Sequence, residues 1–337
     1  MKAAAAQALL NLSTTAAVMR YARELMQRIN QATAHWVDSP DQKALHDFRV
    51  ALRRLRSWLE AYDQAVPLPP KLYGKLRRLA RSTNCVRDAD VVIAWLQARR
   101  AQLKPGERHG WRWLLDRYRQ ERDSGHPRLL GRLPKRWERV ENRLVSALAE
   151  HPATQHERYA ENCVARLDVY YEVLTAGLNA VRGVEEDEAI HHARIAAKRL
   201  RYLLEPLGPA LPAARAMIAR LTELQDQLGH IHDMNVLHHR LGEAVSEAAA
   251  AHAQICLRAA LAPSGAAALK NLRRRDPVPG LIALAGLTRT EAHAGYGSFM
   301  NGAWRIDGET PFLKKDMDQL GAALLGLTAM ADESVAE

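Results

Sequence analysis

Two stretches of the chain decide its fold. Residues 44–60 read ALHDFRVALRRLRSWLE, and residues 189–205 read AIHHARIAAKRLRYLLE. The two stretches are related by an offset of 145, and nine of their 17 positions are identical. The same register continues without an insertion as far as Asp88 and Asp233. Shared composition could imitate one short motif but would not hold one register for so long. We infer an internal duplication and predict a pseudo-twofold fold.

The remaining sequence predicts an all-α protein. Ala, Leu, Arg, Glu and Gln dominate, and runs of alternating β-branched residues are absent. We expect two helical bundles, the first repeat over 1–150 and the second over 151–315, followed by a C-terminal helix or tail over 316–337. Helices are expected at about 12–36, 41–65, 68–82, 88–103, 107–124, 128–150, 155–181, 186–206, 210–228, 232–261, 281–303 and 311–331.

Charge and composition limit the class of partner. The chain has 48 Lys and Arg against 38 Asp and Glu, which gives a formal net charge of +10. A hydrophobic fraction of 47% excludes a disordered polyelectrolyte. Residues 43–87 contain 11 Lys or Arg and 3 Asp or Glu, so most of the excess charge lies in one short segment. This excess predicts a polyanionic partner.

Compartment and membrane association are also constrained. Three widely spaced cysteines predict reduced thiols in a cytoplasmic protein. No run approaches the ~20 apolar residues of a membrane span, and we expect no membrane partner.

The duplicated helices each combine an apolar face with a cationic one. On a helix of ~100° per residue, the apolar residues of 45–59 form one stripe, and the cations form a second stripe about 100° away. Cations three and four residues apart repel by ~0.2–0.5 kcal/mol per pair, so a bound anion would stabilise the stripe. Arginine forks match phosphate oxygens, and histidine, with a reference pKa of ~6.5, would be charged beside a polyanion. The alternative is a solvated charged face. The candidate residues are His46, Arg49, Arg53, Arg56, Lys75, Arg78, His191, Arg194, Lys198, Arg201 and Arg220.

The motif resembles that of a known family. The pattern HxxRxxx(R/K)RLR occurs in both halves, each time followed by an aspartate 42 residues after its histidine. In this it resembles the CHAD family, the conserved histidine α-helical domain, over about residues 12–315. The resemblance implies two pseudo-symmetric bundles with a basic cavity, binding of inorganic polyphosphate, and association with polyphosphate granules. It also matches Arg54 and Arg199, which we rank lower because they point away from the stripes, as we do Lys71 at the flank of the next helix.

The two copies differ in charge. Where the first copy has Lys71 and Arg78, the second has Ala216 and Glu223. We therefore expect the first half to bind a polyanion more strongly.

The aspartates and aromatic residues near the motifs have simpler explanations. Asp88 and Asp233 follow expected helix breaks at Asn84 and Gly229, which predicts helix caps or, alternatively, acceptors that orient an arginine. Four aromatic residues lie among arginines and predict core packing with an arginine rim rather than a stacking platform for bases: Trp111, Trp113, Tyr118 and Trp137.

Our leading hypothesis is a non-enzymatic, cytoplasmic binder of linear inorganic polyphosphate that needs no metal or cofactor. One alternative is a metal-dependent phosphohydrolase acting on polyphosphate or a nucleotide, because His46-Asp47 and His232-Asp233 are similar to the metal-binding dyads of such enzymes. That dyad is not duplicated, since His192 stands where the first copy has Asp47. A nucleic-acid or acidic-protein binding module is the other alternative, and nucleic acid is expected to bind more weakly than polyphosphate.

Overall fold

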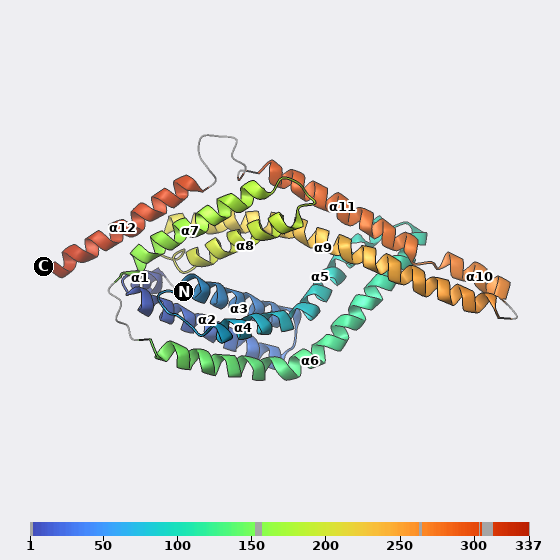
Figure 1. Cartoon of the computed structure of the whole chain (residues 1–337), viewed down its shortest axis with the longest axis horizontal. Coiled ribbons are helices and arrows are strands. Elements are labelled where there is room, and N and C mark those ends of the chain that lie inside the picture. Colours follow the sequence, from blue (N-terminus) through green and yellow to red (C-terminus); the bar gives the residue numbers. More distant parts are fainter. Residues whose placement is uncertain (1–2, 152–156, 263–264, 303, 305–312, 337) are drawn as a thin grey trace. The chain divides into compact units, whose positions relative to one another are not determined.

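The computed structural model describes residues 3–151, 157–262, 265–302, 304 and 313–336. In this part of the chain every regular element is a helix, which confirms the predicted all-α class (Figure 1). Two short 3-10 turns, Arg100–Gln102 and Pro105–Glu107, precede α6. The helices are α1 Ala3–Leu10, α2 Thr14–Asp38, α3 Gln42–Ala61, α4 Pro70–Ser82, α5 Asn84–Arg99, α6 Arg108–Ala149, α7 Tyr159–Ala180, α8 Asp187–Leu204, α9 Pro212–Ala260, α10 Gly265–Arg274, α11 Val278–Met300 and α12 Lys314–Ala336.

The chain divides into two compact units, each assembled from separate segments. The first unit comprises Met1–Thr83, Leu129–Gly229 and Gly297–Glu337. The second comprises Asn84–Arg128 and His230–Tyr296. Every residue of the predicted cationic set lies in the first unit. The repeat boundaries at 150 and 315 are a different division of the chain and stay a prediction.

In the first unit, α2, α3, α4 and residues 129–149 of α6 pack together. The Asp41 carboxylate accepts a hydrogen bond from Ala44 N at 2.7 Å and so caps the N-terminus of α3. The ring of Phe48 on α3 meets Trp137 of α6 edge to face, with centroids 6.5 Å apart. Asn30 of α2 donates to Glu141 of α6 at 2.6 Å. The predicted apolar stripe of α3 is buried, at Leu45, Phe48, Leu52, Leu55 and Leu59.

The same unit contains α7, α8, the first part of α9 and α12. Helices α7 and α8 approach each other closely at Gly177. A Cβ atom built on this glycine would lie only 3.2 Å from the Cα atom of Ala193. Gln225 of α9 donates to the Ala197 carbonyl of α8 at 3.3 Å. Helix α12 packs against α7, and α8 packs against α3. The second apolar stripe is buried as well, at Ile190, Ala193, Ala197, Leu200 and Leu204.

Two predicted helix breaks are wrong. Helix α6 runs through Gly125, Pro127 and Pro134, and α9 runs through Gly229. Inside a helix a glycine costs about 1 kcal/mol and a proline about 3 kcal/mol, but Leu129 after Pro127 and Leu228 before Gly229 are buried and keep these segments packed. Helices α1 and α10 also form where none was predicted.

Asp88 and Asp233, which follow the expected breaks at Asn84 and Gly229, are not helix caps. Asp88 lies in the second turn of α5, and Asp233 lies inside α9. Asp88 instead accepts a hydrogen bond from Arg240 at 3.4 Å within the second unit. The cap prediction is wrong at Asp233 because the break that it required at Gly229 does not form, and at Asp88 because α5 already begins at Asn84.

The second unit is held in part by a half-buried charge pair. Arg99 of α5 contacts Glu291 of α11 through two hydrogen bonds, of 2.6 and 2.9 Å, and Trp95 Nε1 donates to the same carboxylate at 3.1 Å. Burial opposes the charge on Glu291, but these donors and the nearby positive charges outweigh it and lower the pKa of the carboxyl. The three cysteines form no disulfide. Among the residues described, no helix is both long enough and apolar enough to cross a membrane.

Candidate anion-binding site

The duplicated helices α3 and α8 exchange ion pairs in a reciprocal way. Arg54 of α3 contacts the Glu205 carboxylate with N–O distances of 2.5 and 2.9 Å. Arg199 of α8 lies 3.7 Å from the carboxylate of Glu60, at the end of α3. Each pair joins one copy to the other, and both partners are related by the offset of 145. A contact of this kind is what a twofold relation between two helices produces. The duplication itself stays a prediction from the sequence.

These pairs give Arg54 and Arg199 a structural role. Burial opposes the charge of Arg54, but its hydrogen bond to Glu205 and the nearby carboxylate outweigh this and raise its pKa. Its guanidinium also lies over the Tyr202 ring, 5.8 Å from the centroid. The geometry thus supports the lower rank that the helical wheel assigns to both residues.

Two members of the cationic stripe are partly neutralised on their own helices. Arg56 lies 3.7 Å from the carboxylate of Glu60, one turn along α3. Its counterpart Arg201 lies 3.3 Å from Glu205, one turn along α8. Both side chains are more than two-thirds buried. They therefore line the α3–α8 contact with carboxylates already beside them.

Arg49 and Arg194 each lie against the following helix of their own copy. Arg49 donates to the Thr83 hydroxyl and, at 3.5 Å, to the Ala80 carbonyl, so it binds the C-terminus of α4. Arg194 lies beside Gly229 of α9. A Cβ atom built on Gly229 would be 3.4 Å from the Nε atom of Arg194. At Arg49 the first copy uses a charge to complete a helix end. In the second copy α9 continues and offers no such end.

The remaining cations differ in what surrounds them. In the described part of the chain, Arg53, Lys75, Arg78 and Arg194 have no hydrogen-bond or ion-pair partner. The Nε atom of Arg53 is buried from solvent. No carboxylate of the described residues is therefore paired with these four charges.

Other predicted residues are placed as follows. Arg220 of α9 forms an ion pair with Asp316 of α12, so part of its charge is already matched. His46 and Lys71 are exposed, whereas His191 and Lys198 are half-buried. All of them lie in the first unit, on the same four helices as the rest of the set.

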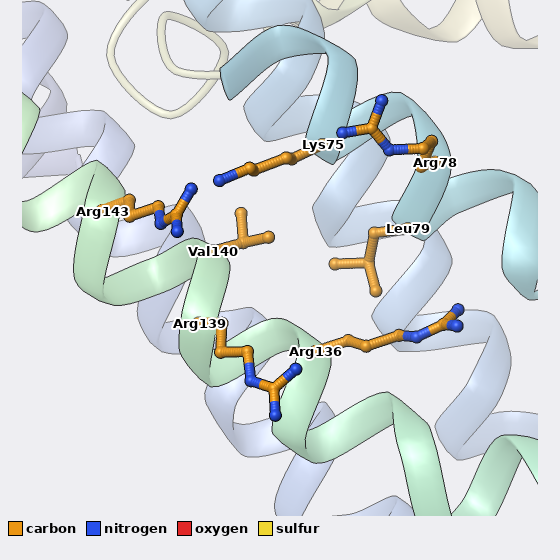
Figure 2. Close-up of a pocket in the computed structure, with 7 residues that line it drawn as sticks. All are labelled: Lys75, Arg78, Leu79, Arg136, Arg139, Val140 and Arg143. Carbon is orange, nitrogen blue, oxygen red and sulfur yellow. The ribbon is translucent and has the colours of Figure 1, made fainter. Parts of the chain in front are cut away.

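Sequence reasoning missed three arginines of α6. Arg136, Arg139 and Arg143 line one cavity together with Lys75 and Arg78 of α4 (Figure 2). Their spacing of three and four residues was a visible signal, since such residues share a helix face. Of the four aromatic residues predicted to be in the core, Trp137 and Tyr118 are buried. Trp111 and Trp113 are only half-buried, and an arginine lies over each ring.

Two histidines of α9 near the His232-Asp233 dyad contact neighbouring protein groups. His238 Nδ1 lies 3.2 Å from both the Ala285 carbonyl and the Thr288 hydroxyl. His230 lies 4.0 Å from Glu291. Within the described ranges, no three His, Cys, Asp or Glu side chains are grouped as a metal ion would require.

Comparison with known proteins agrees with the fold and the motif. The family model of the CHAD domain matches residues 20–242. The crystal structure of the CHAD domain from the plant Ricinus communis is 21% identical, with a TM-score of 0.64, covering 88% of this chain and 94% of that one. PptA from Streptomyces chartreusis is 17% identical, with a TM-score of 0.60, covering 86% of this chain and 98% of that one. At these identities the two structures show a shared fold. No curated protein matches the sequence. Because the family model spans well over half of its residues, this chain belongs to the CHAD domain family.

Proposed function

We propose that this protein binds linear inorganic polyphosphate, without catalysis, through the cations of α3, α4, α8 and α9. The observation that carries the proposal is the set of unneutralised cations in the first unit. The carboxylates Glu60 and Glu205 are engaged by arginines of α3 and α8, while Arg53 and Arg194 are left without a counter-charge among the described residues. A chain of phosphates supplies the missing charge.

The chemistry of the residues favours phosphate. Arginine presents a planar fork of donors that matches two phosphate oxygens, and lysine adds a compact charge. A polyanion that occupies these cations releases its own counterions, so affinity should fall steeply with salt. The position of the protein in the cell follows from the ligand, and we place it in the cytoplasm, at polyphosphate granules.

The test is a competition experiment with end-labelled polyphosphate. At ~0.15 M salt, unlabelled polyphosphate should displace the label at a lower phosphate concentration than duplex DNA does. Equal or better displacement by DNA would show that the site is a general nucleic-acid surface. Better displacement by an acidic polypeptide would assign it to a protein partner.

A pair of variants links the binding to the site. Arg53→Gln with Arg194→Gln should lower polyphosphate affinity about tenfold, because two charge-assisted contacts are removed. The control is Arg108→Gln with Arg112→Gln, two exposed arginines of α6 that have no partner in the described part of the chain. Equal losses in the two variants would show that affinity follows net charge alone.

The enzymatic alternative has its own assay. Phosphate release from polyphosphate is measured with and without divalent metal, for the wild type and for His46→Ala with His191→Ala. We expect no turnover in any of these reactions. Metal-dependent release that the double variant loses would replace binding by hydrolysis as the function.

A further inference from the structure

A cavity of about 330 Å³ lies between α4 and the C-terminal part of α6, within the first unit. Two apolar side chains, Leu79 and Val140, lie between the cations that line it (Figure 2). Both apolar side chains are more than nine-tenths buried. The cations are Lys75, Arg78, Arg136, Arg139 and Arg143.

The charge in this cavity is not compensated. No carboxylate lines it. Among the described residues, none of the five cations has a hydrogen-bond or ion-pair partner. The nearby carboxylate of Glu141 is engaged elsewhere, by the Asn30 amide at 2.6 Å. Five like charges around one small cavity repel each other, and a bound anion would relieve this repulsion.

The arrangement on α6 repeats the arrangement on α3. With ~100° per residue, Arg132, Arg136, Arg139 and Arg143 form a stripe about 60° wide. The buried residues of the same segment, such as Leu133 and Val140, are centred about 90° away from that stripe. The α3 helix shows nearly the same angle between its core and its cations. On α6, however, the cations have no carboxylate one turn away comparable to Glu60 beside Arg56.

Figure 2 shows how the two helices present their charges. Lys75 extends from α4 toward Arg143 on α6, and Arg136 and Arg139 lie along the same side of α6. Helix α4 also packs against α3 and is bound by Arg49 at its C-terminus. The cavity therefore borders the helix that packs directly against the helix with the first cationic stripe.

We propose that this α4–α6 cavity is a second phosphate-binding segment, occupied by the same polyphosphate chain that binds α3 and α8. This inference rests on the proposed function and adds Arg136, Arg139 and Arg143 to the binding surface. Phosphate is favoured over an acidic protein because Lys75 and Arg78, which line this cavity, are also members of the cationic set that we assign to polyphosphate. Arginine supplies three of the five cations and can bind phosphate oxygens in pairs.

The experiment measures polyphosphate affinity at several salt concentrations. The variant is Arg136→Gln, Arg139→Gln and Arg143→Gln, and the matched control is Arg108→Gln, Arg112→Gln and Arg119→Gln on the same helix. Each triple variant loses three positive charges, and all six arginines are exposed. With a slope of ~0.7 per phosphate contact for a single strand, the salt dependence of the first variant should fall by about 2, and that of the control should be unchanged.

Each outcome separates this proposal from the one on which it rests. Absence of polyphosphate binding by the wild type would remove the proposed function and this inference together. Wild-type binding with an unchanged slope in the α6 variant, or with equal decreases in both variants, would remove only the α6 segment. Selective competition at the α6 residues by poly-aspartate rather than polyphosphate would assign the cavity to an acidic protein.

A second variant controls for folding. Arg136→Lys, Arg139→Lys and Arg143→Lys keeps the charge and removes the planar forks. It should keep the salt slope of the wild type and bind several-fold more weakly. A slope as low as that of the glutamine variant, with unchanged helicity by circular dichroism, would contradict an electrostatic role for these residues.

Discussion

The reciprocal pairs between α3 and α8 allow stability and binding to be separated. Arg54 contacts Glu205 through two N–O distances of 2.5 and 2.9 Å, and the two side chains are 26% and 12% exposed. Arg199 contacts Glu60 at 3.7 Å and is 45% exposed. The two arginines occupy equivalent positions in the two copies. Their environments nevertheless predict different energies.

The size of the difference follows from burial. A hydrogen bond to a charged group contributes about 1.5–3 kcal/mol, and breaking a fully buried pair costs about 3–5 kcal/mol. Glu205 keeps a second partner, since Arg201 lies 3.3 Å away, so Arg54→Ala does not leave an isolated charge. We expect Arg54→Ala to lower the free energy of unfolding by about 1.5–3 kcal/mol. For Arg199→Ala the exposed geometry predicts less than about 1 kcal/mol.

Chemical denaturation is the assay, followed by tryptophan fluorescence and far-ultraviolet circular dichroism. The two probes must give coincident transitions for a single free energy to apply. A double-mutant cycle of Arg54→Ala with Glu205→Gln should give a coupling of about 1–2 kcal/mol, and the cycle of Arg199→Ala with Glu60→Gln should give less than about 0.5 kcal/mol. Polyphosphate affinity should change by less than about threefold at ~0.15 M salt, because both arginines are already paired. Equal destabilisation by the two arginine variants would refute the reasoning, as would loss of binding without loss of stability.

Two further predictions concern other charged contacts. Glu291→Gln should destabilise by about 1–2 kcal/mol at pH 7 in thermal or chemical unfolding. Because the folded state lowers the pKa of Glu291, this stabilisation is present above the unfolded-state pKa of ~4.3 and is lost as the pH falls through the folded-state pKa. A difference in stability between wild type and variant that persists at pH 2 would contradict the assignment. Arg49→Ala should destabilise by about 1–2 kcal/mol because α4 loses its C-terminal donor, whereas Arg53→Ala should change stability by less than about 0.5 kcal/mol and weaken polyphosphate binding several-fold. Unfolding and binding curves for both variants decide this, and the reverse pattern would exchange the two roles.

Periodicity predicted the parts of the fold that depend on burial. Every apolar position of the two duplicated stripes is buried, because a helix that packs on one side must repeat its apolar residues at that period. Glycine and proline were less reliable as predictors of where a helix ends. Pro127 and Gly229 carry a helical penalty of a few kcal/mol at most, and burial of neighbours such as Leu129 and Leu228 outweighs it. The long helices α6 and α9 therefore could not be predicted from local preference.

The sequence also could not predict which groups would pair with the charged residues. The helical wheel separated Arg54 from the cationic stripe, but it could not show that Glu205 of the other copy would receive it. Similarly, Arg49 and Arg53 are one turn apart on one face of α3 and look equivalent. Only the position of α4 shows that the first completes a helix end while the second lacks a carboxylate partner in the described structure.

The α6 arginines were missed for a reason that bears on how the protein binds. The register of the duplication extends only as far as Asp88 and Asp233, so a search for duplicated cations does not reach Arg136, Arg139 and Arg143. Arg78, across the cavity, corresponds to Glu223. Of the two α4 cations that line the α4–α6 cavity, only Lys75 therefore has a cationic counterpart in the second copy, Arg220. Arg220 is paired with Asp316, whereas Lys75 has no partner in the described part of the chain. A polyphosphate chain bound along both copies would therefore meet unequal fields, and its additional contacts should all form on the first.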